Sequence, residues 1–160
     1  MNYTTMIFSP TGGTEKAVMA LTSGWGERIA TVDLSNAGLD FFQFSFQPKD
    51  TVVIAAPSYG GRVPGLAAER IQKVQGNGAK AVLVCVYGNR AYEDTLVELK
   101  DLSKAAGFKV TAAVAAIAEH SIVRRFAAGR PDVEDLAILA GYGQTILERL
   151  QSSAQVGPIP

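Results

Sequence analysis

The sequence has 160 residues, of which 48% are hydrophobic, and its 15 Lys and Arg residues balance 15 Asp and Glu residues at a formal net charge of zero. This length suits a single domain with a full hydrophobic core, and the scattered basic residues argue against nucleic acid or an anionic membrane surface as partners. No apolar run is long enough to span a bilayer and the first residues do not resemble a signal peptide, so we expect a cytoplasmic protein.

The first part of the chain alternates strand patterns with a helix pattern. Residues 3–8 form a β-branched and aromatic run that is typical of a strand, and residues 15–21 have a helix-forming composition before Gly24. Residues 29–34 alternate like a second strand, and residues 51–56 are a continuous apolar run of the kind that a parallel sheet buries on both faces. These segments predict the start of a parallel α/β sheet.

Residues 36–48 break this alternation. Phenylalanine stands at every second position from 42 to 46, and the residues between are polar. A period of two is typical of extended backbone rather than of a helix, so we predict that this crossover lacks a helix. We interpret it as a strap whose phenylalanines, Phe41 included, cover the sheet, in preference to a ligand pocket.

The only cysteine of the chain lies in a predicted core strand. Residues 66–74 have the composition of a helix that stops before Gly76, and residues 79–87 form another buried strand, which contains Cys85. A lone thiol in such a strand behaves as a small hydrophobic group. A single cysteine also excludes a disulfide within the chain and a cysteine-ligated cluster, so we give Cys85 no reactive role.

The last part of the chain continues the alternation. Residues 92–106 carry leucines at helical spacing, residues 108–117 indicate a fifth strand, and residues 132–150 present leucines and an isoleucine on one side of a final helix. We expect residues 152–160 to be a frayed tail, so the folded domain covers residues 1–151.

Five strands that alternate with helices predict an α/β protein. Parallel strands need right-handed crossovers that place helices on both faces, which gives a three-layer α/β/α sandwich around a five-stranded parallel sheet. The strand order that suits this pattern is 2-1-3-4-5. In such a sheet the ligand crevice lies at the carboxyl ends of the strands, between strands 1 and 3, where the order reverses. The loops after strands 1, 3 and 4 are therefore the candidate site.

The loop after the first strand has the composition of a phosphate site. It reads Ser9-Pro10-Thr11-Gly12-Gly13-Thr14 and stands directly before a predicted helix. Glycines let backbone N–H groups turn inward, the helix N-terminus adds a positive partial charge, and the hydroxyls donate further hydrogen bonds, so no Lys or Arg is needed. A capped strand-to-helix connection without a ligand is the alternative.

Three other classes of protein with a ligand loop at this position do not fit. A P-loop needs Gly-Lys-Ser/Thr, whereas Gly13 is followed by Thr14 and Glu15. A dinucleotide fingerprint needs Gly-x-Gly-x-x-Gly, which this loop lacks. A response-regulator receiver needs carboxylates after strands 1 and 3, where this chain has Ser9 and Pro57. These three classes are therefore excluded.

The loops after strands 3 and 4 are both rich in tyrosine and glycine. One begins Pro57-Ser58-Tyr59-Gly60-Gly61, and the other reads Tyr87-Gly88-Asn89-Arg90-Ala91-Tyr92. Aromatic faces and unhindered peptide groups suit a flat ring with hydrogen-bonding edges. Either loop alone is better interpreted as a turn whose tyrosine covers the end of the sheet. Their occurrence beside a phosphate loop favours the ligand.

These loops resemble those of a known family. Residues 9–14 resemble the flavodoxin phosphate loop, Ser/Thr-x-Thr-Gly-x-Thr, and residues 57–64, 86–92 and 127–132 match further segments of such proteins. Over about the first 150 residues, the chain is similar to the flavodoxin domain of bacterial flavodoxin/ferredoxin-type flavoproteins. The resemblance implies a flavodoxin-like fold and FMN as the cofactor.

The resemblance also implies roles for individual residues. Residues 9–14 would hold the FMN phosphate, and residues 57–61 would hold the isoalloxazine and the ribityl chain together with Tyr87, Gly88, Asn89, Arg90 and Tyr92. In flavodoxins a glycine peptide near flavin N5 responds to the redox state. Gly60 or Gly61 would be its counterpart in this chain.

Two departures from the family bear on the partners. Relatives of this kind often continue into a ferredoxin domain, whereas one cysteine leaves any iron–sulfur partner to another polypeptide. Flavodoxins are strongly acidic, whereas this chain is neutral and has Arg124, Arg125 and Arg130 in the predicted loop after strand 5. These arginines belong to a solvated loop or receive an acidic partner or anionic substrate. His120, in the same loop, is a structural residue or a general acid.

The sequence leaves more than one function open. The first is an electron carrier that shuttles electrons between redox partners, such as a ferredoxin or a reductase, through bound FMN. The second is an FMN-dependent oxidoreductase that takes hydride from NAD(P)H and reduces a quinone or another small acceptor. We prefer the carrier because no nicotinamide-binding motif can be identified, and we assign no catalytic residue and no metal. A redox-inert interaction module that has kept the fold is the third alternative.

Overall fold

The fold is a parallel sheet between two layers of helices. The computed structural model describes residues 1–87, 93–117 and 133–156. Its strands are β1 (Tyr3–Ile7), β2 (Arg28–Asp33), β3 (Thr51–Pro57), β4 (Lys80–Tyr87) and β5 (Lys109–Ile117). All neighbouring strands are parallel, in the order β2-β1-β3-β4-β5. The predicted fold class and strand order are confirmed.

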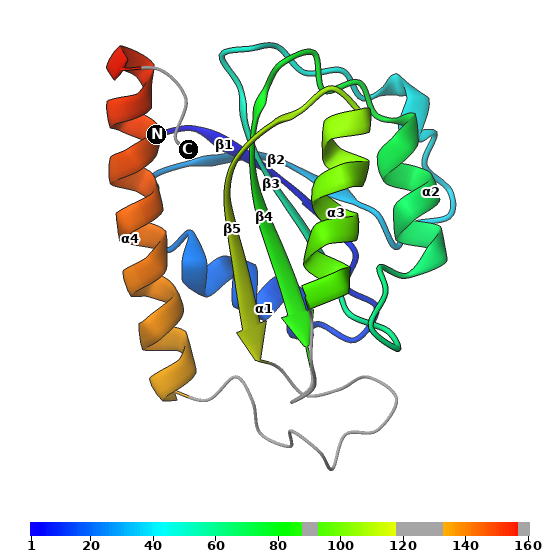
Figure 1. Cartoon of the computed structure of the whole chain (residues 1–160), viewed down its shortest axis with the longest axis horizontal. Helices are drawn as coiled ribbons and strands as arrows, with labels where there is room; N and C mark the ends of the chain where they lie inside the picture. Colours follow the sequence, from blue (N-terminus) through cyan, green and yellow to red (C-terminus); the bar gives the residue numbers. More distant parts are fainter. Residues whose placement is uncertain (88–92, 118–132, 157–160) are drawn as a thin grey trace.

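In the described ranges, four α-helices cover the two faces of this sheet. They are α1 (Gly13–Leu21), α2 (Gly65–Lys73), α3 (Glu93–Ala105) and α4 (Val133–Val156). Helices α1 and α4 pack on one face, and α2 and α3 pack on the other (Figure 1). The three-layer sandwich predicted from the alternating pattern is therefore present.

The central strands β3 and β4 explain why the sequence shows continuous apolar runs. In β3, Val53 and Ala55 pack on the α1 and α4 side, whereas Val52 and Ile54 pack on the α2 and α3 side. All four residues are fully buried, as is expected for a parallel strand that is covered on both faces. Cys85 of β4 is also fully buried, and burial raises the pKa of its thiol to about 12.

Helices α4 and α1 approach each other closely where they cross. A Cβ atom on Gly143 would stand 1.7 Å from the carbonyl oxygen of Leu21, so only glycine allows this approach. The buried indole of Trp25 donates its Nε1–H to the Gly143 carbonyl at 2.9 Å. The same indole meets the ring of Tyr3 edge-on, with 5.4 Å between the ring centroids. These contacts fix the last helix against the first part of the fold.

The crossover between β2 and β3 contains no α-helix, as its period of two predicts. It differs from a fully extended strap in one respect, because residues Phe41–Gln43 form a short 3₁₀ turn, η1, whose first residues are held by Asp40. The side-chain Oδ1 of Asp40 accepts the N–H of Phe42 at 3.1 Å. The turn buries Phe41 and exposes Phe42, while Phe44 and Phe46 pack against the core.

The end of α4 corrects the predicted tail. The helix continues to Val156, although the sequence pattern predicted an end at residue 150 and a frayed tail over residues 152–160. The pattern of apolar residues stops at Leu150, but the following Ser, Ala and Gln residues can extend a helix, and the first strong helix breaker is Gly157. The end of the apolar pattern therefore did not mark the end of the helix.

Candidate functional site

The loops after β1 and β3 leave the sheet side by side at its carboxyl edge. Figure 1 shows this edge at the bottom of the view, where the arrowheads of β4 and β5 lie. Strands β1 and β3 are neighbours, with Ile7 paired with Ala55, and the N–H of Phe8 donates to the Ala55 carbonyl at 3.0 Å. The order of the strands reverses between β1 and β3, which is where a sheet of this topology opens a ligand crevice.

Ser9 anchors the loop between β1 and α1. Its backbone N–H donates to Oγ of Ser35 at 3.1 Å, and Ser35 is itself held by Asp33, whose Oδ1 accepts the Ser35 N–H at 2.9 Å. The hydroxyl oxygen of Ser9 accepts the backbone N–H of Glu15 at 3.1 Å. Ser9 therefore caps the first turn of α1, and within the described part of the chain its own hydroxyl proton has no acceptor, so it can be donated to a ligand.

The start of α1 presents a set of open hydrogen-bond donors. Gly12 is the N-cap residue at φ +89°, and no side chain at that position caps the helix. In residues 1–87, 93–117 and 133–156, no acceptor pairs with the backbone N–H groups of residues 11–14 or with the hydroxyl of Thr14, which is 4% exposed. A buried hydroxyl without a partner is costly unless a ligand satisfies it. Together with the helix N-terminus, these groups form a cradle for an anion such as phosphate.

The loop after β3 folds into a tight two-residue turn. The N–H of Tyr59 donates to the Arg62 carbonyl at 2.8 Å, and the N–H of Arg62 donates back to the Tyr59 carbonyl at 3.0 Å. Gly60 and Gly61 form the tip at φ +58° and +80°, which fits a type I′ turn and favours glycine at both positions. Apart from the adjoining residues of the chain, no atom of the described residues lies within 4 Å of where a Cβ atom would stand on either glycine, so nothing packs against the turn on that side.

Tyr59 at the base of this turn is half-buried. Its side chain packs against the core cluster on the α2 and α3 side of the sheet. The ring therefore covers the end of the sheet, as in the ligand-free interpretation of this loop, while part of its surface stays exposed at the carboxyl edge.

The chain segment before the turn is tied to β4 and α3. The N–H of Ser58 donates to the Val86 carbonyl at 2.8 Å, which continues the pairing of β3 with β4. The hydroxyl of Ser58 lies 2.7 Å from the hydroxyl of Thr95 in the first turns of α3, and both residues are buried. This contact between two hydroxyls holds the segment in place and leaves neither group unsatisfied.

The segment after the turn is held by one carboxylate. Oε1 of Glu98 accepts Nε–H of Arg62 at 3.0 Å and the backbone N–H of Val63 at 2.8 Å, and Oε2 accepts Nη2–H of Arg62 at 2.9 Å. The hydrogen bond from Arg62, supported by that from Val63, lowers the pKa of the Glu98 carboxyl below its usual value. Glu98 is therefore ionised at neutral pH and bound at three points.

The third predicted loop is represented only by its first residue. Tyr87 is the last residue of β4 and is half-buried at the carboxyl edge, beside the end of β3. The other predicted site residues of this loop, Gly88, Asn89, Arg90 and Tyr92, lie outside the described residues. The same holds for His120 and for Arg124, Arg125 and Arg130.

The described residues contain neither a membrane-spanning helix nor a cluster of metal ligands. None of the described helices is long and apolar enough to cross a membrane. Within the same ranges, no group of three or more His, Cys, Asp or Glu side chains could hold a metal ion.

Sequence reasoning missed the residues that support the loops. Thr95 and Glu98 stand three positions apart on α3, so they lie on the same side of that helix, and both reach the loop after β3. Ser35, after β2, supports the loop after β1 in a similar way. The only signal for Thr95 was a polar residue four positions before Leu99 on the leucine side of a predicted helix, where an apolar residue is expected.

Several solved structures have a fold similar to that of this chain. Flavodoxin 1 from Bacillus cereus is 14% identical, with a TM-score of 0.63 over 92% of this chain and 98% of that protein. A flavodiiron core from Synechocystis sp. is 13% identical with a TM-score of 0.63, and this chain, matched over 96% of its length, spans only 36% of that protein. An NADH:FMN oxidoreductase in its apo form is 12% identical, with a TM-score of 0.62 over 92% of this chain and 89% of that protein.

The chain resembles these proteins in structure rather than in sequence. No protein-family model matches the sequence, and no curated protein matches it. At identities of 12–14%, the shared feature is the fold, so the chain has the flavodoxin fold that its loops and strand order predicted. Residues 57–61 and the loop after β1 lie at the edge of this fold where the strand order reverses.

Proposed function

We propose that the chain binds FMN at the carboxyl edge of the sheet and carries electrons between redox partners in the cytoplasm. The observation that carries this proposal is the pair of loops with open donors on either side of the topological switch point. One loop offers the N–H groups of residues 11–14, which have no acceptor within the described residues, and the other offers the peptide groups of Gly60 and Gly61.

The fit of the phosphate to the first loop rests on its donors. The backbone N–H groups at the start of α1 and the buried hydroxyl of Thr14 have no acceptor among the residues that the structure describes, and a phosphate supplies several oxygens. Thr11 is exposed beside them and can donate its hydroxyl. Gly12 keeps the approach open, because a Cβ atom at that position would meet nothing and its φ of +89° favours glycine.

The fit of the flavin ring rests on the second loop. The turn at Gly60 and Gly61 presents peptide N–H and C=O groups with no side chain over them, which can bind the edge of a flat ring. Tyr59 and Tyr87 stand at the same edge and can cover its faces, with Gly88, Asn89, Arg90 and Tyr92 as further predicted ligands. When bound, FMN supplies the ability to accept and release electrons, and the residues of this chain bind, orient and shield it.

The second candidate function is an FMN-dependent oxidoreductase that uses NAD(P)H and a small acceptor such as a quinone. Its support is the structural likeness to a protein described as an NADH:FMN oxidoreductase. Against it, the sequence has no identifiable nicotinamide-binding motif. We therefore propose a protein partner, such as a ferredoxin or a reductase, as the source of electrons.

The two functions are separated by one experiment on the purified protein reconstituted with FMN. Absorption is recorded during stepwise anaerobic reduction, and NADH or NADPH is then added to the oxidised protein in the presence of a quinone. A carrier shows a protein-bound flavin spectrum, is reduced by dithionite or by a ferredoxin with its reductase, and leaves NAD(P)H unconsumed. Steady oxidation of NAD(P)H by the protein alone would favour the oxidoreductase, and failure to retain FMN would reject both.

A further inference from the structure

Helix α3 is hydrogen-bonded to the loop after β3 on both sides of its turn. Thr95 contacts Ser58 before the turn at 2.7 Å, and Glu98 contacts Arg62 and Val63 after it at 2.8 to 3.0 Å. Thr95 and Glu98 are three positions apart on one helix, so a single rigid element holds both ends of the turn. Because Thr95 is fully buried and Glu98 is bound at three points, this support is firm at the base of the turn.

The tip of the turn has the opposite character. Gly60 and Gly61 have no side chains, and no atom lies within 4 Å of where a Cβ atom would stand on either residue. Within the described ranges, their N–H groups have no acceptor. Among the residues that the structure describes, the tip is shaped by the two hydrogen bonds between Tyr59 and Arg62. Motion of the tip is therefore restricted from its base, and the base after the turn is held by Glu98.

From this arrangement we propose that Glu98 is a positioning residue that fixes the Gly60–Gly61 turn against the flavin and so sets the reduction potential of the bound FMN. This inference rests on the proposed function, because it requires FMN at the carboxyl edge. Glu98 itself lies on α3 and acts through Arg62 and Val63.

The physical reason is a change in the hydrogen-bonding character of the ring. Two-electron reduction with uptake of a proton converts a flavin ring nitrogen from an acceptor into a donor. A turn with open N–H and C=O groups can serve both states, but the free energy of each contact depends on how well the turn is held. When the turn is released, the reduced ring loses a pre-positioned acceptor, so we expect the potential to become more negative.

Loss of the Glu98 charge alone would shift the reduction potential in the opposite direction. Removing a carboxylate near the flavin favours the reduced, more negative ring and so raises the potential. Glu98→Asp keeps the charge and withdraws the carboxylate by one methylene, whereas Glu98→Gln removes the charge and keeps the length. A positioning role therefore predicts the same direction of shift for both variants.

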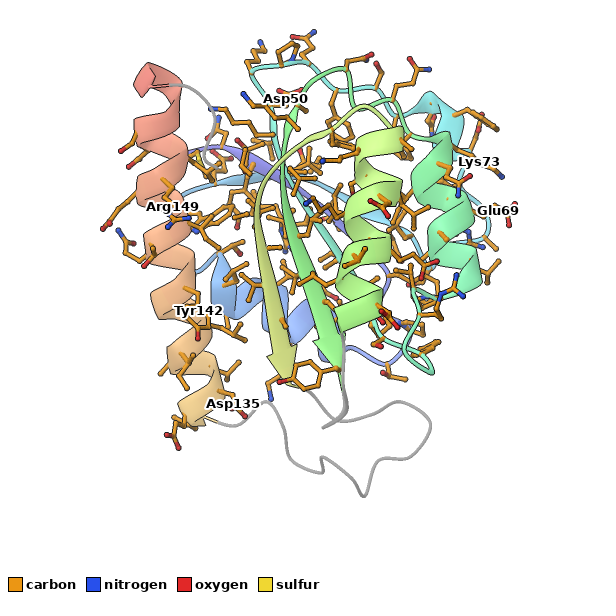
Figure 2. The ribbon with its side chains drawn as sticks, viewed as in Figure 1. Asp50, Glu69, Lys73, Asp135, Tyr142 and Arg149 are labelled. Carbon is orange, nitrogen blue, oxygen red and sulfur yellow. The ribbon has the colours of Figure 1, made fainter. Side chains whose placement is uncertain are left out.

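Glu69→Gln is the matched control. Glu69 is an exposed residue of α2 that pairs with Lys73 at 3.4 Å, so this variant also removes one carboxylate from an ion pair on a neighbouring helix. Figure 2 shows Glu69 and Lys73 on the outer side of α2, away from the edge at which β4 and β5 end. This variant should leave the potential unchanged.

The test compares the potentials of the four FMN-loaded proteins and the hydrogen exchange of the Tyr59 and Arg62 amides in the corresponding apoproteins. Both Glu98 variants should still bind FMN. Their preference for reduced over oxidised FMN should fall about tenfold, which is a shift in potential of about −30 mV for two electrons. The Tyr59 and Arg62 amides should exchange faster in both variants. The proposal is overturned if Glu98→Asp behaves like the wild type, or if the Glu98→Gln potential rises while exchange is unchanged. A wild-type protein that does not bind FMN at all would instead refute the proposed function.

Discussion

The two ends of the sheet use glycine for opposite purposes. At the amino end, a Cβ atom on Gly76 would lie 2.7 Å from the carbonyl carbon of Gly107 and 2.9 Å from the carbonyl oxygen of Ala106. At the carboxyl end, a Cβ atom on Gly12, Gly60 or Gly61 would meet nothing within 4 Å. Glycine therefore allows close packing of backbone at one end, and at the other it keeps space and backbone groups open.

The hydrogen bonds follow the same division. At the amino end, Gly76 N–H donates to the Ala106 carbonyl at 2.7 Å and Gly78 N–H donates to the Gly107 carbonyl at 2.8 Å. The side-chain amide of Asn77 donates to Ser45 and to the Phe46 carbonyl at 2.9 and 3.0 Å. The amino end satisfies its own polar groups, whereas the carboxyl end leaves donors for a ligand. A stabilising end and a binding end can thus be told apart by where the backbone groups are paired.

The largest expected effect is on stability, from a methyl group at the amino end. Gly76→Ala forces three backbone atoms away from positions below 3.0 Å and should lower the free energy of unfolding by about 3 kcal/mol. Gly12→Ala at the carboxyl end meets no atom and carries only the strain of its positive φ, about 1 kcal/mol. Urea unfolding measures both variants. Equal losses would contradict the division between the two ends.

A second effect separates ligand affinity from stability. Thr14→Val removes a buried hydroxyl that has no partner in the described part of the chain, so the apoprotein should be as stable as the wild type while FMN binds about ten- to a hundredfold more weakly. Thr111→Val is the control at the amino end, because the Thr111 hydroxyl donates to the Ala81 carbonyl at 3.1 Å. This variant should lose about 1 kcal/mol of stability and keep its FMN affinity. The reverse pattern would assign Thr14 to the scaffold.

The middle of the sheet should be chemically inert. The pKa of the Cys85 thiol is raised to about 12 by burial, so iodoacetamide at pH 8 should alkylate the native protein about a thousandfold more slowly than the urea-unfolded chain. Mass spectrometry at timed intervals measures both rates. Because the protonated thiol is favoured in the fold, its contribution to stability is complete below the ordinary cysteine pKa and declines as the pH rises towards 12. Rapid alkylation of the folded protein would show that β4 is accessible.

The smallest expected effect is the pH dependence of the stability that the Glu98–Arg62 ion pair contributes at the carboxyl end. Since the pKa of Glu98 is lowered in the fold, its ion pair contributes to stability above the ordinary glutamate pKa, and the contribution is lost as the pH falls through the lowered value. The difference in unfolding midpoint between the wild type and Glu98→Gln should therefore be small at pH 7, given that the Arg62 side chain is 71% exposed, and should decrease as the pH falls below the ordinary glutamate pKa. A difference that stays constant as the pH falls would mean that the carboxylate charge is not the cause.

The fold could be predicted from the sequence because its cues are local. The apolar runs of β3 and β4, the alternation in β2 and the period of two in the phenylalanine strap each indicate an element without knowledge of the rest. The end of α4 at Val156 could not be predicted, because the apolar pattern ends before the helix does. The 3₁₀ turn at Phe41–Gln43 was missed because a period of two hides a single capped turn.

Part of the candidate site could be predicted from the sequence, and part of it could not. Ser9, Thr14 and the two glycines after Tyr59 could be found because they are contiguous segments at the ends of predicted strands. Their support could not, because Glu98 lies 36 positions from Arg62 and 35 from Val63, and only the folded chain brings them together. Nothing in the residues around Glu98 distinguishes it from an ordinary solvent-facing glutamate of α3.

The central claim is that the open donors at the start of α1 bind a phosphate and that the ligand is FMN. Isothermal titration of the apoprotein with FMN and with riboflavin tests it most directly, because the two ligands differ only in the phosphate. We predict that FMN binds at least about a hundredfold more tightly, as expected for charge-assisted hydrogen bonds from several donors, and that inorganic phosphate competes with FMN but not with riboflavin. Equal affinity for the two flavins, or no binding of either, would contradict the account.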